Sequence, residues 1–209
     1  MDRSILRSGV YLLLCAYLAL HFGAANGITF YQPTLSDANG INGRQKAVLA
    51  TILATTDLVG RLLAGIFASI GFIRSRLTIA LFVNQVFQCI GVLTLVFSKT
   101  FLQIALSSGL YGFFYGSWFT LFFSLVPEVA STSQMIVAMG VVFALCGVST
   151  LLTPPIAGAI ANTMGGVDII FWVLLCFLFA ANFVLFLAMY RRHFWKATSC
   201  VGALGRLIG

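Results

Sequence analysis

Residues 46–72 read KAVLATILATTDLVGRLLAGIFASIGF, an apolar stretch with one aspartate and one arginine, Asp57 and Arg61, near its centre. A helix of this length spans the roughly 30 Å hydrocarbon core of a bilayer. The spacing of four places both charged side chains on one helix face, where they can pair. A lone charge at the middle of a bilayer costs on the order of 2.5 kcal/mol or more. The stretch therefore predicts a membrane-spanning helix whose charged pair faces other helices or water.

The composition of the whole chain agrees with a membrane environment. Of its 209 residues, 60% are hydrophobic and only 8% are charged, whereas soluble domains carry about 25% charged residues. A soluble chain of this length cannot cover so much apolar surface. The net charge of +7 does not indicate a nucleic-acid partner, because the lysines and arginines lie mostly at the ends of apolar runs.

Six segments are long and apolar enough to cross a bilayer, which takes about 20 residues. They are residues 9–31, 46–72, 77–97, 101–126, 133–161 and 167–190. The first also has a signal-peptide-like pattern, charged residues followed by an apolar run and small residues at 23–25, but its apolar character continues to Tyr31 and favours a span. The expected fold is an all-α integral membrane protein, with residues 1–209 forming a single six-helix transmembrane bundle.

Positive charge predicts the orientation of this bundle, because cytoplasmic loops carry an excess of lysine and arginine. With both termini inside, eight basic residues lie on the cytoplasmic side and three outside, and Arg61 lies within the membrane. The cytoplasmic set is Arg3, Arg7, Arg74, Arg76, Arg191, Arg192, Lys196 and Arg206, and the outer set is Arg44, Lys46 and Lys99. We expect a multi-pass protein of the plasma membrane with both termini in the cytoplasm.

The charged pair has two interpretations. Asp57 and Arg61 can be a self-neutralising pair that only fixes the rotation of the helix. Alternatively, the arginine presents a planar fork that matches a carboxylate in two parallel hydrogen bonds, and Asp57 holds it when substrate is absent. Protonation of Asp57 would then free Arg61 to bind an anion. Ionisable residues within membranes mark transport pathways by default, which favours the functional interpretation.

Other segments within the spans have a structural and a functional interpretation. Small residues at a spacing of four, Gly23 with Gly27 and Gly112 with Gly116, predict close helix packing. Tyr115 and Phe119 also lie four apart and line an apolar wall for a substrate, or else face lipid. Residues 153–155, Thr-Pro-Pro, predict a kink, which either lies beside a transport site or is static. His21 lies within the first span, where a histidine is more often a hydrogen-bonded packing residue than a proton relay.

No motif indicates an enzyme, a metal centre or a cofactor. The five cysteines are not spaced as metal ligands, and hydrolase triads, HExxH and phosphate-binding glycine loops are missing from the sequence. An intramembrane enzyme is therefore disfavoured, and we expect no cofactor and no metal.

Four segments in order resemble a known family. Residues 56–65, TDLVGRLLAG, are similar to helix eight of the monocarboxylate transporters, which belong to the major facilitator superfamily. Residues 31–35, YQPTL, resemble the end of helix seven, and residues 112–116, GFFYG, resemble helix ten. Residues 147–158, GVSTLLTPPIAG, resemble helix eleven, with Thr153 in place of a glycine. The resemblance covers nearly the whole chain.

The resemblance implies that the chain is the C-terminal six-helix half of a twelve-helix secondary transporter of small organic acids, with or without proton coupling. In the family the helix-eight pair serves substrate and proton coupling, which implies these roles for Asp57 and Arg61. An aromatic residue of helix ten affects selectivity, and Tyr115 matches it. Phe119 joins this candidate site by its spacing.

The same resemblance leaves one wall of the transport path outside the chain, including the helix-one lysine of proton-coupled members. The expected partners are a small organic anion, a proton if transport is coupled, and the lipid bilayer. An N-terminal half, a second copy or an accessory membrane subunit would complete the path. The alternative functions are a non-transporting membrane protein that binds or regulates a full-length transporter, and an inactive fragment.

Overall fold

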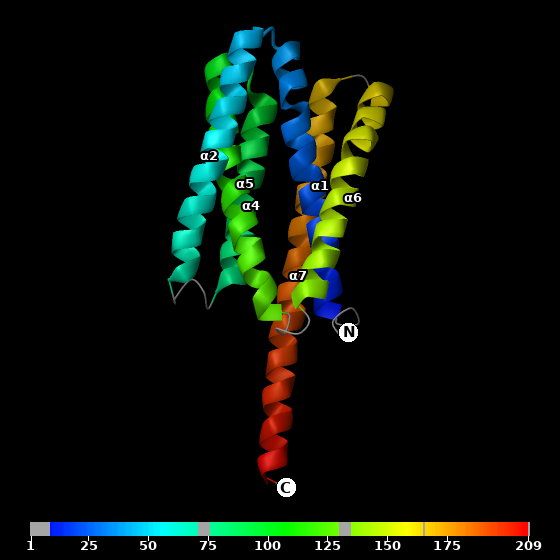
Figure 1. Cartoon of the computed structure of the whole chain (residues 1–209). Coiled ribbons are helices and arrows are strands. Elements are labelled where there is room, and N and C mark those ends of the chain that lie inside the picture. Colours follow the sequence, from blue (N-terminus) through cyan, green and yellow to red (C-terminus); the bar gives the residue numbers. More distant parts are fainter. Residues whose placement is uncertain (1–8, 71–75, 130–134, 165, 209) are drawn as a thin grey trace.

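The computed structural model describes residues 9–70, 76–129, 135–164 and 166–208, and these form helices with short turns and no strand. In chain order the helices are α1 (Gly9–Ala38), α2 (Gly43–Ser69), α4 (Leu77–Phe97), α5 (Phe101–Val129), α6 (Met135–Met164) and α7 (Val167–Ile208). The predicted all-α fold is confirmed. Helix α7 continues well past the predicted span 167–190 and projects from the lower end of the bundle in Figure 1.

Five of these helices are long and apolar enough to cross a membrane, namely α1, α2, α4, α6 and α7. Helix α5, which contains the predicted span 101–126, is 29 residues long but is not among the five. Its glycines and its buried serines Ser107, Ser108 and Ser117 lower its hydropathy. Because these polar groups face other helices instead of lipid, their cost in the bilayer is reduced.

The helices form two groups of three (Figure 1). Helix α5 packs against α2 and α4, whereas α1 packs against α6 and α7, and the two groups meet chiefly where α4 contacts α7. The first three helices, α1, α2 and α4, correspond in order to the last three, α5, α6 and α7. Under this correspondence, the contacts of α1 with α6 and α7 match those of α5 with α2 and α4. This pattern is that of an internal repeat with inverted topology.

The turn between α1 and α2 is short because α1 extends to Ala38 and α2 begins at Gly43. Gly40 has φ of 70°, a left-handed conformation that glycine adopts without strain. An ion pair between Lys46 and Asp37 closes the turn. The turn lies at the upper end of the bundle in Figure 1, opposite to the start of α1 and to the projecting part of α7.

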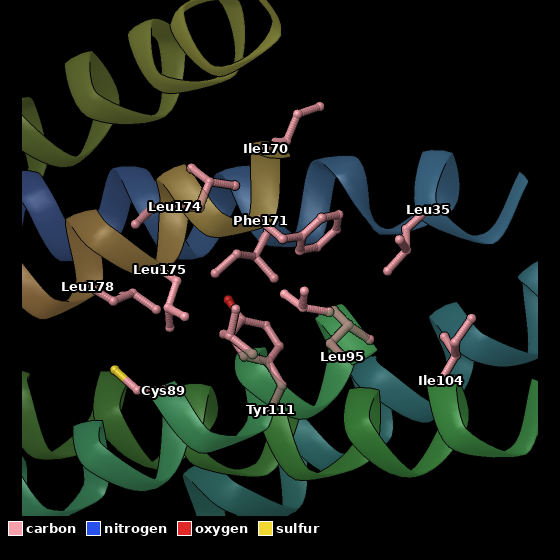
Figure 2. Close-up of a cluster of buried hydrophobic side chains, with 14 of the residues drawn as sticks. Leu35, Cys89, Leu95, Ile104, Tyr111, Ile170, Phe171, Leu174, Leu175 and Leu178 are labelled. Carbon is pink, nitrogen blue, oxygen red and sulfur yellow. The ribbon is translucent and has the colours of Figure 1, made fainter. Parts of the chain in front are cut away.

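Two clusters of buried apolar side chains occupy the two ends of the bundle. The cluster near the start of α1 joins the beginnings of α1, α4 and α6 to the ends of α2 and α5 and to the middle of α7. Figure 2 shows part of the other cluster, which brings together Leu175 and Leu178 of α7, Leu95 of α4 and Tyr111 of α5. Because lipid tails are as apolar as these side chains, the clusters stabilise the bundle mainly through van der Waals packing.

Candidate functional site

Helices α2 and α5 lie in direct backbone contact at the middle of the bundle. A Cβ atom at Gly116 would fall on the carbonyl oxygen of Asp57, and one at Gly60 would fall on the carbonyl oxygen of Phe113. A Cβ at Gly112 would lie 2.7 Å from the carbonyl oxygen of Leu53. The predicted packing role of Gly112 and Gly116 is confirmed. Sequence reasoning missed Gly60, although Gly60 and Ala64 have the same small-residue spacing of four.

Two hydroxyl groups of α5 fix its register against α2. Ser117 Oγ donates to the carbonyl oxygen of Gly60 at 3.2 Å, and Thr120 Oγ1 donates to that of Arg61 at 3.3 Å. The charged residues of α2 therefore lie beside the segment of α5 from Tyr115 to Thr120.

Asp57 and Arg61 form a two-point ion pair, as their spacing predicted. Arg61 Nε donates to Asp57 Oδ2 at 2.9 Å, and Nη2 donates to Oδ1 at 3.2 Å. The side chains are 19% exposed for Asp57 and 36% exposed for Arg61. The guanidinium carbon lies 4.3 Å from the ring centre of Phe119, within cation–π distance. The aspartate and the phenylalanine ring thus hold the arginine from two sides.

The arginine keeps hydrogen-bonding capacity beyond Asp57. A guanidinium is planar and carries more N–H donors than a single carboxylate engages. The bonds to Asp57 use the edge formed by Nε and Nη2, and a second edge is formed by Nη1 and the other proton of Nη2. A carboxylate can bind this second edge in two hydrogen bonds without displacing Asp57. Arg61 therefore need not be released from Asp57 in order to bind an anion.

The aromatic candidates lie in the same region. The Tyr115 ring lies parallel to the rings of Tyr111 and Trp118, with centroid distances of 5.9 and 6.3 Å. Its neighbour in the chain, Gly116, lies against the backbone and the carboxylate of Asp57. Tyr115 and Phe119 are partly buried and not fully exposed to lipid. The structure thus brings together all four predicted residues, Asp57, Arg61, Tyr115 and Phe119, between α2 and α5.

The proline segment of α6 lies apart from this group, against α1. Helix α6 is helical through Pro154 and Pro155, and the Tyr31 hydroxyl of α1 donates to the carbonyl oxygen of Pro154 at 2.8 Å. A Cβ at Gly27 of α1 would lie 2.9 Å from a methyl group of Leu174. A Cβ at Gly23 would lie even closer to the side-chain hydroxyl of Thr153, so the predicted packing role of Gly23 and Gly27 is confirmed.

His21 is a packing residue. It is completely buried and stacks on the Trp118 ring with a centroid distance of 3.8 Å and an interplanar angle of 23°. Neither ring nitrogen has a hydrogen-bond partner among the described residues. The prediction that His21 is hydrogen-bonded is therefore wrong. Trp118 Nε1 instead donates to the hydroxyl oxygen of Tyr17.

The described residues contain no group of three or more His, Cys, Asp or Glu side chains that could hold a metal. Cys15, Cys89 and Cys146 are buried free thiols within helices, and Cys176 is an exposed one. The chemistry that the site offers is therefore that of a charged pair and aromatic rings: it can bind an anion and an apolar group beside it.

Helices apolar enough to cross a bilayer, an inverted-repeat pattern of contacts and an ion pair within one of these helices are typical of a multi-pass membrane protein built from internal repeats. The profile of the Major Facilitator Superfamily matches residues 13–198. The chain belongs to the Major Facilitator Superfamily.

Individual relatives are monocarboxylate transporters. The chain is 27% identical to monocarboxylate transporter 12 of Xenopus laevis over 161 residues. The matched region covers 77% of this chain and 35% of that protein. It is 23% identical over 190 residues to monocarboxylate transporter 1 of Bos taurus, covering 90% of this chain and 38% of the relative. The chain thus spans about a third of the length of the curated relatives it matches.

Proposed function

We propose that this chain forms one wall of a transport path for small organic acids of the monocarboxylate type, and that Arg61 binds the carboxylate. The observation that carries the proposal is the second edge of the Arg61 guanidinium, which Asp57 does not occupy. Asp57 and the Phe119 ring hold the guanidinium in place, so less conformational freedom is lost when the anion binds. Tyr115 and Phe119 supply the apolar surface beside the carboxylate.

We further propose that a proton crosses with the anion. Moving one charge across a potential of 100 mV involves about 2.3 kcal/mol, and a proton carried with each anion removes this term. Asp57 is the acidic group next to the Arg61 guanidinium and is our candidate for carrying the proton.

We propose that an N-terminal half of the same superfamily forms the second wall of the path. The alternatives for this wall are a second copy of this chain and an accessory membrane subunit. Sites in such transporters lie between two repeats that rock against each other. The chain acts as one six-helix unit, with both termini in the cytoplasm of a plasma-membrane protein. The bias of eight basic residues to three supports this orientation.

The test is uptake of labelled lactate or pyruvate into proteoliposomes under an inward proton gradient. One preparation holds the chain alone, and the other also holds the N-terminal half of a monocarboxylate transporter. We expect uptake only in the second preparation, and we expect a protonophore to reduce it. Absence of uptake from both preparations, with both polypeptides folded, would refute the transport proposal.

Substitutions at Arg61 test its part in binding. Arg61→Lys keeps the charge but loses the planar fork, so we expect a loss of affinity for the anion of about tenfold, the value of one strong hydrogen bond. Arg61→Gln should abolish uptake. Arg44→Gln, at the exposed start of α2, is the matched control and should leave uptake unchanged. Equal uptake by Arg61→Lys and the wild type would exclude two-point binding.

The rival function is regulation of a full-length transporter by a non-transporting chain. Co-purification with a complete transporter, a change in that transporter's uptake and no anion binding by the chain itself would favour this rival.

A further inference from the structure

Helix α5 carries two rows of aromatic side chains. Tyr111, Trp118 and Phe122 are at most 2% exposed and pack in the interior. Tyr115, Phe119 and Phe123 follow one another at intervals of four along the helix and are partly buried. The second row packs against the core cluster with one side, and its other side stays accessible beside Arg61.

The second row continues onto a neighbouring helix and forms an aromatic strip of Phe119, Phe123 and Phe143. The ring centres of Phe119 and Phe123 lie 4.6 Å apart, and those of Phe123 and Phe143 of α6 lie 5.4 Å apart with an interplanar angle of 23°. Phe143 is 55% exposed. One end of the strip lies under the Arg61 guanidinium, and the other end is open.

Aromatic side chains on the outside of a membrane helix often contact lipid and need no further explanation. This strip differs because it is continuous with an arginine whose outer edge can bind a carboxylate. Offset or tilted contacts between rings at these distances are worth more than the burial of equal apolar area. The combination of a two-point anion site and adjoining rings matches a molecule that has a carboxylate at one end and a ring at the other.

We infer that the aromatic strip binds the ring of an aromatic carboxylate whose carboxylate group pairs with Arg61. The inference rests on the proposed function and narrows its substrate class from small organic acids to those with an aromatic ring a short chain away from the carboxylate. Phe123 and Phe143 then select for an aromatic ring in the ligand, whereas Arg61 selects for its negative charge.

The experiment measures binding of tritiated 3-phenylpropanoate to the full chain in nanodiscs of zwitterionic lipid, with empty nanodiscs as background. Unlabelled propanoate and 3-cyclohexylpropanoate compete for the site. We expect propanoate to bind at least about tenfold more weakly, because it lacks the buried ring. We expect 3-cyclohexylpropanoate to bind about threefold more weakly, because its ring has no π system. Simple partition into lipid gives the opposite order for the two ring compounds.

Variants separate the strip from the anion site. Phe123→Leu and Phe143→Leu keep an apolar side chain, and we expect each to lower the affinity for 3-phenylpropanoate about threefold or more while leaving that for propanoate unchanged. The matched control is Phe183→Leu on α7, where the phenylalanine is 62% exposed. Arg61→Gln should remove binding of all three carboxylates.

The failures of the two proposals are distinguishable. Equal affinities for the three carboxylates, with binding lost in Arg61→Gln, would overturn the aromatic inference and support the organic-acid site. Preference for the phenyl compound that persists in both phenylalanine variants would overturn the role of the strip. No binding of any carboxylate to the folded chain would overturn both proposals.

Discussion

Two helix pairs occupy equivalent positions in the inverted repeat, α2 with α5 and α6 with α1, and they are built differently. Helices α2 and α6 are the least buried of the membrane-crossing helices, with 22% and 17% of the residues buried in the apolar 18-residue segment of each. Yet α2 contacts α5 backbone to backbone through Gly60 and Gly116. Helix α6 contacts α1 through side chains such as Tyr31, and its own Gly140 and Gly147 face open space.

The difference follows from what each pair carries. The second edge of Arg61 is useful only if the guanidinium stays in one place, and a backbone contact that excludes even a methyl group fixes the register of α2 on α5. The α1–α6 pair carries no such charged group among its described side chains. Its close contacts are made by side chains, with Thr153 against Gly23 and Tyr31 against Gly158, and side chains can move aside more easily than backbone. We interpret α2–α5 as the fixed pair and α1–α6 as the adjustable pair.

The largest effect is expected from breaking the fixed pair. Gly116→Leu would force a side chain into the Asp57 backbone, and because backbone cannot move aside, we expect loss of the folded bundle. The milder Gly116→Ala should cost about 3 kcal/mol, at the upper end for overpacking. Unfolding in detergent, followed by circular dichroism and size-exclusion chromatography, measures both.

Gly147→Leu is the matched control in α6, because no atom lies within 4 Å of a Cβ at this position. It should fold normally. If Gly116→Leu and Gly147→Leu had the same stability, the distinction between the two helix pairs would be wrong.

The next effect concerns the charged pair that the fixed helices hold. Asp57→Leu or Arg61→Leu alone leaves one charge near mid-membrane, and each should lower stability by about 2 kcal/mol, somewhat below insertion-scale values because both side chains are partly exposed. The double variant has no charge and should regain most of this stability. Chemical denaturation in detergent of the wild type, both single variants and the double variant measures the coupling.

This double variant also separates the two interpretations of the pair. A stable double variant that no longer binds a carboxylate indicates a pair kept for function. A double variant that binds carboxylate as well as the wild type would leave only the structural interpretation.

Much of the fold could be predicted from sequence because a bilayer imposes simple rules. Long apolar runs form helices, and glycines at a spacing of four favour close packing on a neighbour, as Gly112 and Gly116 show. Helix α5 shows the limit of hydropathy, since serines and glycines that face other helices lower the score of a segment that still packs inside the bundle.

The candidate site was only partly predictable. A spacing of four is enough to pair Asp57 with Arg61 on one helix. It cannot indicate that Phe119 of another helix lies under the guanidinium, or that the row from Phe119 continues to Phe143 of α6. These contacts depend on the register between helices, which Gly60, Ser117 and Thr120 determine. No local pattern specifies which carbonyl oxygen a serine will reach.

A smaller effect is expected when one hydrogen bond is removed from each pair. Tyr31→Phe deletes the bond to the Pro154 carbonyl oxygen and should lower the free energy of unfolding by about 1 kcal/mol. Ser117→Ala should cost less, because the Ser117 hydroxyl also lies 2.9 Å from the carbonyl oxygen of Phe113 on its own helix and the glycine contact persists. A larger cost for Ser117→Ala than for Tyr31→Phe would mean that the contact between α2 and α5 depends on hydrogen bonds and not on the close fit at the glycines.

The smallest effect is expected at Gly140 of α6, where an added methyl group meets nothing within 4 Å. In the chain alone, Gly140→Ala should change the free energy of unfolding by no more than about 0.5 kcal/mol, with any change favouring the variant because alanine is the better helix former.

The same substitution in the presence of an N-terminal half makes the comparison sharper. If α6 is adjustable because a second half packs on its open face, Gly140→Ala should weaken that association while leaving the chain alone unaffected. Co-purification of the two halves from one membrane preparation measures this, with Gly43→Ala as the control at an open position, the first residue of α2. A clear loss of stability in the chain alone would show that α6 is packed as tightly as α2 and would remove the difference between the two pairs.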